Sequence, residues 1–284
     1  MKQAFIHIYK KTAGSKMKIA LIQNEVFPSF SKTFEHIKSL ITQAVSQKPD
    51  VILLGELWNT PYDNDMIVQA TSYQDTCLTY LQQISQDYHL LMVGGSIPFL
   101  DKGHIYNRCF IFDHGHLMEQ YDKTHLLEVH THQHHYQEKD VFSKGDHLSL
   151  ISYQNQKIGI EICYDIRFPE CSRILTEKGA QIIFCPAAFN ASVGPIHWRS
   201  LLQTRAMENQ VFMVGVSPSQ YTYEAYTSYG HSMIVDPFGK VIIEMDEKPG
   251  FQIFDIDVSK VESTRKRMPF WSIRRTDLYT IKEN

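Results

Sequence analysis

The chain has 284 residues, of which 43% are hydrophobic and 21% charged, an ordinary composition for a globular protein with one large core. Its formal net charge of −3 excludes a global field that would attract nucleic acid or an anionic membrane, so we expect a small-molecule partner. No apolar stretch approaches the ~18 residues that a membrane-spanning helix needs.

The cysteines indicate the compartment. They are odd in number, scattered along the chain and free of CxxC pairs, so neither a disulfide framework nor a thiolate zinc site is indicated. We therefore expect a cytoplasmic protein. The five residues are Cys77, Cys109, Cys163, Cys171 and Cys185.

The first residues of the chain differ from the rest. Residues 1–16 contain several lysines and a short apolar part, without the small-residue cleavage pattern of a signal peptide. Met17 directly precedes a strand-like run. We therefore predict that residues 1–16 are an N-terminal extension outside the core and that residues 17–284 form one domain.

The first half of that domain alternates short apolar runs with segments of helical period, which is typical of an α/β protein. Two strands then follow one another directly over residues 106–121. They are joined by a tight turn in which Gly115 can adopt a positive φ. The predicted strands before this hairpin span residues 18–23, 51–54 and 90–95, and the predicted helices span 33–46 and 74–88.

The second half repeats this style, and no Pro-, Gly- or Ser-rich linker separates the two halves. The sequence therefore predicts a single-domain α/β fold, a four-layer α-β-β-α sandwich of two facing sheets with helices outside. The predicted strands span 148–153, 157–162, 181–185, 211–216, 232–235, 240–244 and 252–255, and the predicted helices span 169–177 and 197–209.

Three polar side chains follow the ends of predicted strands. Cys163 ends an apolar run just before the chain must turn, a position that holds a nucleophile rigidly. Glu56 follows another such run, and a buried carboxylate with a raised pKa can exchange protons near neutrality. Lys123 lies just past a third strand. Each also has a simpler interpretation: a small buried hydrophobe for the cysteine, and a solvated or paired surface charge for the others.

The surrounding residues make these positions more specific. Gly-Glu-Leu-Trp at Glu56, Tyr-Asp-Lys-Thr-His-Leu at Lys123 and Ile-Cys-Tyr-Asp-Ile-Arg-Phe-Pro-Glu at Cys163 resemble the three signatures of the nitrilase superfamily of carbon-nitrogen hydrolases. The resemblance covers about residues 17–280 and implies an α-β-β-α sandwich with a Glu-Lys-Cys triad. It also assigns a second active-site carboxylate to Glu138, which is otherwise a solvated loop residue.

The resemblance implies a mechanism that requires no metal or cofactor. Glu56 would accept the proton of Cys163, because a free thiol is only a few per cent thiolate at neutral pH. Lys123 and the backbone N–H of Tyr164 would stabilise the oxyanion that forms. Glu138 would orient Lys123 or the substrate amide.

Residues 186–210 are similar to the corresponding stretch of the omega-amidase branch, which hydrolyses the terminal amide of 2-oxo-dicarboxylate monoamides such as 2-oxoglutaramate and 2-oxosuccinamate. We expect Ser192 or Gly194 to cap the helix that follows, with Pro195 in its first turn. The candidate substrate-binding residues are Tyr164, Arg167, Phe189 and Arg205, although an ion pair for either arginine and a core position for the phenylalanine are equally ordinary.

Other functions use the same residues. A nitrilase or an N-carbamoyl amide hydrolase would share the triad, and a catalytically idle member of the superfamily would serve as a binding or scaffold protein. A metallohydrolase is suggested by His125, His130, His132, His134 and His135, but this cluster has neither a HExxH arrangement nor accompanying cysteines, so we predict no metal site. The tail over residues 264–279 mixes cations with aromatics, and we interpret it as a homodimer contact.

Overall fold

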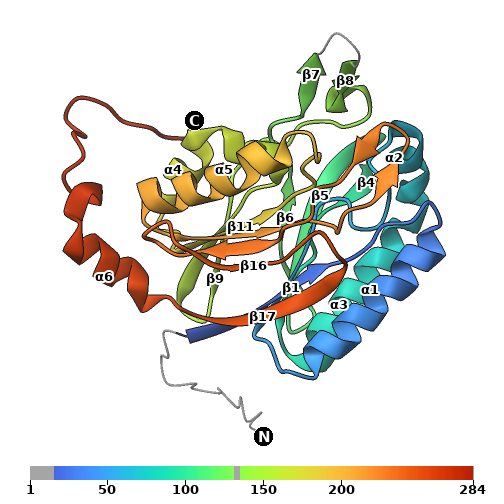
Figure 1. Ribbon diagram of the computed structural model, residues 1–284, viewed down its shortest axis with the longest axis horizontal. Coiled ribbons are helices and arrows are strands. Elements are labelled where there is room, and N and C mark those ends of the chain that lie inside the picture. Colours follow the sequence, from blue (N-terminus) through green and yellow to red (C-terminus); the bar gives the residue numbers. More distant parts are fainter. Residues whose placement is uncertain (1–15, 131–134, 284) are drawn as a thin grey trace, which may run out of the picture.

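The computed structural model describes residues 16–130 and 135–283, which form two facing sheets with helices on the outside of each (Figure 1). This is the predicted four-layer sandwich. The first sheet has the order β17-β1-β2-β3-β5-β4, with β6 paired to β5. Its strands are β1 (Lys16–Gln23), β2 (Val51–Leu54), β3 (Leu91–Val93), β4 (Ile97–Asp101), β5 (His104–Asp113), β6 (His116–Asp122) and β17 (Gly250–Asp257).

The second sheet has six strands in the order β16-β15-β12-β11-β10-β9. It runs parallel at its centre, where β10, β11 and β12 pair in register. Two small hairpins lie outside both sheets. The strands of the sheet are β9 (Ser149–Tyr153), β10 (Gln156–Ile160), β11 (Ile182–Pro186), β12 (Phe212–Val216), β15 (Met233–Val235) and β16 (Val241–Glu244), and the hairpins are β7 (Glu128–His130) with β8 (His135–Gln137) and β13 (Thr222–Tyr223) with β14 (Tyr226–Thr227).

The helices cover the outer faces, α1 and α3 on the first sheet and α4 and α5 on the second (Figure 1). The two helices on the second sheet come directly after loops of the candidate site. The bounds are α1 (Phe30–Val45), α2 (Asn64–Ala70), α3 (Gln74–Tyr88), α4 (Pro169–Glu177), α5 (Gly194–Asn209) and α6 (Ser259–Arg267), with 3₁₀ turns over Thr71–Tyr73, Glu138–Asp140, Cys163–Arg167 and Pro269–Trp271.

Strand β1 shows why apolar residues follow one another without polar interruption. Successive side chains of a strand point to opposite faces. Ile19 and Leu21 pack in the cluster that contains the second sheet, whereas Ala20 and Ile22 pack with the residues of α1 and α3. Both faces are therefore buried, as expected for a sheet with a parallel centre.

Most predicted elements are confirmed, several with their predicted bounds. The hairpin turn is confirmed in detail, because His114 and Gly115 both have positive φ values, 50° and 80°. The structure corrects the start of α5. The helix begins at Gly194, and its cap position is Val193, whose side chain has no group to make a capping hydrogen bond. Ser192 and Gly194 therefore do not cap it by side chain, although Pro195 does lie in the first turn.

Among the residues that the structure describes, no helix is both long enough and apolar enough to cross a membrane. The N-terminal extension lies outside the described residues up to position 15, and β1 begins at Lys16.

The packing between the two sheets generates a stability prediction. Leu53 of β2 is fully buried in the cluster that joins the sheets, whereas Leu117 on β6 is 51% exposed. Leu53→Ala should lower the free energy of unfolding by about 2–5 kcal/mol, because it leaves a cavity in a close-packed layer. Leu117→Ala is the matched control and should change it by less than about 0.5 kcal/mol. Denaturant unfolding measures both, and equal effects would contradict this packing.

Candidate active site

The candidate residues come from both sheets and meet between them. Glu56 lies two residues beyond β2 and Lys123 directly after β6, both in the first sheet. Cys163 begins the 3₁₀ turn that follows β10 of the second sheet. Glu138 begins another 3₁₀ turn after the small strand β8. The structure thus brings together all four residues that the sequence predicts as catalytic.

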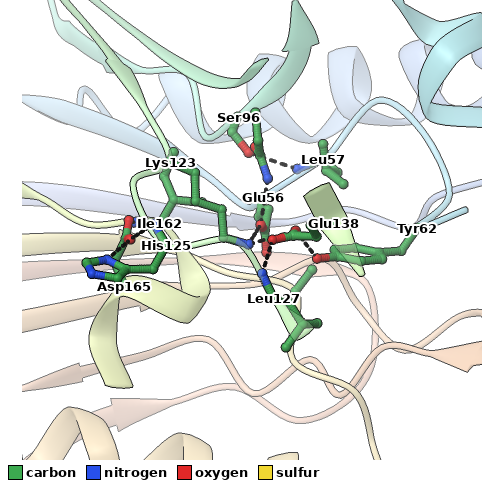
Figure 2. Close-up of polar contacts among 12 residues, drawn as sticks. Glu56, Leu57, Tyr62, Ser96, Lys123, His125, Leu127, Glu138, Ile162 and Asp165 are labelled. Carbon is green, nitrogen blue, oxygen red and sulfur yellow. Dashed lines mark hydrogen bonds and ion pairs between the residues drawn. The ribbon is translucent and has the colours of Figure 1, made fainter. Parts of the chain in front are cut away.

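Lys123 is held between the two carboxylates (Figure 2). Its Nζ donates to Glu56 Oε1 at 2.7 Å and to Glu138 Oε1 at 2.8 Å, and all three side chains are fully buried. Burial lowers the pKa of Lys123, but the charges of Glu138 and Glu56 together raise that pKa well above its ordinary value. The lysine is therefore a fixed ammonium ion.

In Glu56, burial and the neighbouring charge combine to shift the pKa differently. Burial raises its pKa, and the opposing charge of Lys123 only partly offsets this. Its Oε1 also accepts a hydrogen bond from Asn107 Nδ2 at 2.8 Å. Its Oε2 accepts none from the described residues. A buried carboxylate with one unpartnered oxygen and a raised pKa is suited to accept and return a proton.

Cys163 has an unusual backbone conformation. Its φ is +47°, in the left-handed region that side chains other than glycine rarely adopt. The side chain is 6% exposed, and burial followed by the charge of Glu56 raises the pKa of its thiol well above the ordinary value, with Lys123 opposing. The resting group is therefore a thiol that needs a base, and Glu56 is near enough for each group to affect the pKa of the other.

Asp165 fixes this turn to the strand end that carries Lys123. Its Oδ2 accepts from the backbone N–H of Ile162 at 2.9 Å and from Tyr121 Oη at 2.8 Å. Its Oδ1 accepts from Thr124 Oγ1 and from the backbone N–H of His125, each at 2.9 Å. This fully buried carboxylate therefore ties the 3₁₀ turn Cys163–Arg167, here called the cysteine turn, to the segment around Lys123.

Glu138 is held by donors as well. Its Oε1 accepts a hydrogen bond from Tyr62 Oη in addition to that from Lys123, and its Oε2 accepts from the backbone N–H of Leu127 at 2.5 Å (Figure 2). This buried position contradicts the simpler interpretation of a solvated loop residue. Tyr62 and Asn107 were missed by the sequence analysis. The available signals were an aromatic residue in a polar loop for Tyr62 and, for Asn107, a polar residue next to Arg108 in a strand that is otherwise largely apolar.

Aromatic side chains surround the carboxylates. Tyr62 stacks on Tyr226 with 4.9 Å between ring centroids, and Tyr136 lies 5.8 Å from Tyr62. Tyr221 Oη accepts a hydrogen bond from the backbone N–H of Tyr62 at 3.2 Å. The hydroxyl of Tyr62 donates to Glu138 and that of Tyr226 to the carbonyl of Ala188 at 2.9 Å, whereas the buried hydroxyl of Tyr136 has no hydrogen-bond partner among the described residues.

The predicted substrate-binding residues differ in what they contact. The guanidinium of Arg167 lies over the rings of Tyr164 and Phe189, at 5.6 and 5.1 Å. Phe189 is 4% exposed and also packs on Trp198, with 4.9 Å between ring centroids. It therefore contacts Arg167 on one side and belongs to the hydrophobic core on the other.

Arg205 is occupied by the protein itself. Its Nε donates to the carbonyl of Ile166 at 2.8 Å, its Nη2 to the carbonyl of Arg167 at 3.1 Å, and its Nη1 pairs with Glu208 at 2.9 Å. The side chain is buried. We therefore regard Arg205 as a support for the cysteine turn and not as a carboxylate binder.

The histidines do not converge in the part of the loop that the structure describes. His125 contacts Asp165 through Nδ1 at 2.9 Å and stacks on Phe168, whereas His130 pairs with Glu128 at 2.7 Å. His132 and His134 lie outside the described residues. Over residues 16–130 and 135–283, no group of three or more His, Cys, Asp or Glu side chains could hold a metal ion.

A carboxylate, an ammonium and a thiol between the sheets of an α-β-β-α sandwich define the nitrilase-like class of hydrolase. Comparison with known proteins agrees: a family model described as carbon-nitrogen hydrolase matches residues 18–266. The chain belongs to the carbon-nitrogen hydrolase family.

Relatives match along nearly the whole chain. Omega-amidase NIT2 of Xenopus tropicalis is 33% identical over 272 residues, covering 95% of this chain and 99% of the relative. Omega-amidase NIT2 of Mus musculus is 32% identical over 271 residues, with 94% and 98% covered. The crystal structure of Saccharomyces cerevisiae Nit3, a member of branch 10 of the nitrilase superfamily, superposes with a TM-score of 0.82 at 32% identity, covering 92% of this chain and 97% of that one.

The C. elegans NitFhit protein superposes with a TM-score of 0.89 at 29% identity, covering 95% of this chain and 68% of that one. These matches confirm the predicted resemblance and the predicted fold class.

The position of Asp165 leads to a second prediction. Asp165→Asn replaces one acceptor oxygen by an NH₂ group that faces donors, and it should lower the free energy of unfolding by about 1–3 kcal/mol. Asp146→Asn is the matched control, because the Asp146 side chain is 96% exposed and should have little effect. Denaturant unfolding of the two variants measures the difference. A loss no larger for Asp165→Asn than for the control would show that the carboxylate does not hold the turn.

Proposed function

We propose that the protein is a cysteine-dependent amidase that cleaves the terminal amide of a small carboxylated substrate and releases ammonia, with omega-amidase-like preference for 2-oxoglutaramate or 2-oxosuccinamate. The buried Glu56–Lys123–Glu138 cluster beside Cys163 is the observation that carries the proposal. The relatives named omega-amidase, at about one third identity over nearly the whole chain, support the choice of substrate.

The first half-reaction forms a thioester. Glu56 accepts the thiol proton, and the thiolate of Cys163 attacks the amide carbon. The carbonyl oxygen becomes an oxyanion, which the ammonium of Lys123 and the backbone N–H of Tyr164 stabilise. When the tetrahedral intermediate collapses, protonated Glu56 gives its proton to the nitrogen, the C–N bond breaks and ammonia leaves.

The second half-reaction regenerates the enzyme. Glu56 accepts a proton from water, the hydroxide attacks the thioester carbon, and the C–S bond breaks to release the carboxylic acid. The cysteine then recovers its proton. Glu138 contributes by accepting a second hydrogen bond from the ammonium of Lys123, and Tyr62 donates to Glu138 in turn. Preorganised donors of this kind need no reorganisation during the reaction.

The carboxylate of the substrate is assigned to Arg167. This residue ends the same 3₁₀ turn that Cys163 begins, and its guanidinium lies over Tyr164 and Phe189 at the wall of the site. A planar guanidinium suits bidentate recognition of a carboxylate.

We further propose a cytoplasmic homodimer in which the C-terminal tail contacts the partner, with residues 1–16 as an extension to the core. The five cysteines are all free, which supports a reducing compartment. Large apolar side chains are exposed on α5 and in the tail, which supports an interface there. Examples are Ile196 at 69%, Met207 at 50%, Ile273 at 68% and Leu278 at 68% exposure.

The nucleophile assignment is tested by Cys163→Ala. Ammonia release from 2-oxoglutaramate should fall by up to about 10⁶-fold, because no thiolate is left to attack. Cys77→Ala is the matched control: this cysteine is also buried, burial raises its pKa to about 12, and it lies in the helix layer, so activity should persist. Turnover retained by Cys163→Ala with a folded protein would overturn the mechanism.

The same assay separates the competing functions. Wild-type protein is offered amide, nitrile and N-carbamoyl substrates, and ammonia and carbon dioxide are measured. An amidase releases ammonia from the amide without carbon dioxide. Preferred turnover of the nitrile or the carbamoyl compound would replace the proposal by one of those activities, and turnover of none would indicate an idle binding protein.

The raised pKa of Glu56 leads to a prediction for pH. The reaction needs Glu56 as a carboxylate, and burial raises its pKa above the ordinary value of 4.5. As the pH falls, Glu56 should take up its proton before an ordinary glutamate does. The acid limb of kcat/KM should therefore lie above pH 4.5. A pH–rate profile measures this, and an acid limb at or below that value would argue against Glu56 as the base.

A further inference from the structure

We propose that His197 is a positioning residue that sets the preference for carboxylated substrates by holding Arg167 without neutralising it. This inference rests on the proposed function, in which Arg167 binds the substrate carboxylate. Arg167 Nη1 and His197 Nδ1 are 3.1 Å apart. An arginine is always protonated and can only donate, so Nδ1 must accept and the imidazole must be neutral.

A neutral partner leaves the Arg167 guanidinium able to bind an anion. Within residues 16–130 and 135–283, no carboxylate lies within ion-pair distance of the Arg167 guanidinium, whereas Arg205, Arg274 and Arg275 are each paired with one. A carboxylate partner would cancel the charge and occupy the donors that a substrate needs. An imidazole uses one donor and leaves the full positive charge for the ligand.

His197 is on a rigid support. It lies in the first turn of α5, where its backbone N–H donates to the carbonyl of Val193 at 2.9 Å. The start of the helix cannot shift easily, because Gly194 packs so closely against Tyr229 that a Cβ at this position would lie 2.3 Å from the ring. The acceptor nitrogen therefore has a fixed place relative to the second sheet.

The backbone of Arg167 is also fixed. Arg205 binds the carbonyls of Ile166 and Arg167, as described above, and is itself paired with Glu208. The guanidinium of Arg167 lies over the rings of Tyr164 and Phe189, which restrict its movement. With both backbones held, the hydrogen bond to His197 sets the direction of the remaining guanidinium donors.

The inference predicts a defect that depends on the substrate. Succinamate and butyramide have the same four-carbon chain ending in an amide, but only succinamate has a carboxylate at its other end. His197→Ala should raise the KM for succinamate about tenfold through loss of a hydrogen bond to a charged group, with kcat within about twofold. The KM for butyramide should not change. His197→Gln, which keeps a neutral acceptor, should restore most of the loss.

Binding gives an independent measurement. In the Cys163→Ala protein, calorimetry with succinate should show affinity weakened about tenfold by His197→Ala and largely recovered by His197→Gln. In an Arg167→Ala background, His197→Ala should add nothing, because its effect acts through the arginine.

The outcomes separate the two proposals. An equal loss of kcat on both amides, or unchanged succinate affinity in His197→Ala, would overturn the role of His197 while leaving the amidase intact. If wild-type protein releases no ammonia from any amide, the proposed function fails. Circular dichroism of each variant confirms that the fold is retained.

Discussion

The interaction on which the site depends is the burial of one ammonium ion between two carboxylates. Taking charges out of water costs several kcal/mol for each ion, and only close contacts in good geometry offset this cost. Lys123 has such contacts on both sides, and each carboxylate has further donors from Asn107, Tyr62 or the backbone. Removing any one partner would leave an unpaired charge in a dry interior. The same arrangement that makes the cluster costly to assemble makes it preorganised for an oxyanion.

The supports of the cysteine turn are distributed over distant parts of the chain. Asp165 connects the turn to the strand end at Lys123, and Arg205 of α5 holds the carbonyls at its far end. Together they hold Cys163 at a backbone conformation that it would not adopt alone. The proposed nucleophile is thus placed by contacts between elements and not by local preference.

The fold was largely readable from the sequence because the strands are buried on both faces and so appear as apolar runs. Strand β4 was missed for a specific reason: Pro98 argues against a strand, but β4 is at the edge of its sheet, where a missing donor is tolerated. Helix α6 was missed because only Val261 and Thr264 are buried, which gives no apolar period. Helix α2 has seven residues, too few for a periodic signal, and is marked only by its Asp63 cap.

The residues of the candidate site were predictable only where they lie within sequence signatures of the family. Glu56, Lys123 and Cys163 stand in recognisable surroundings, and their meeting point follows from strand ends. The partners Tyr62, Asn107 and Asp165 act through distances that no single sequence reveals. An arginine such as Arg205 could bind a substrate carboxylate or support the fold. Only its hydrogen-bond partners, which all belong to the protein, show that it supports the fold.

The two sheets divide the proposed reacting groups between them. The first sheet carries the carboxylate and the ammonium, the second carries the thiol, and the backbone N–H of Glu56 crosses the gap to the carbonyl of Ala187 at 3.3 Å. A loosened state that keeps every strand and helix but loses the packing between layers would separate the thiol from the proposed base. The proposed catalysis therefore requires the alignment of the two layers in addition to intact secondary structure.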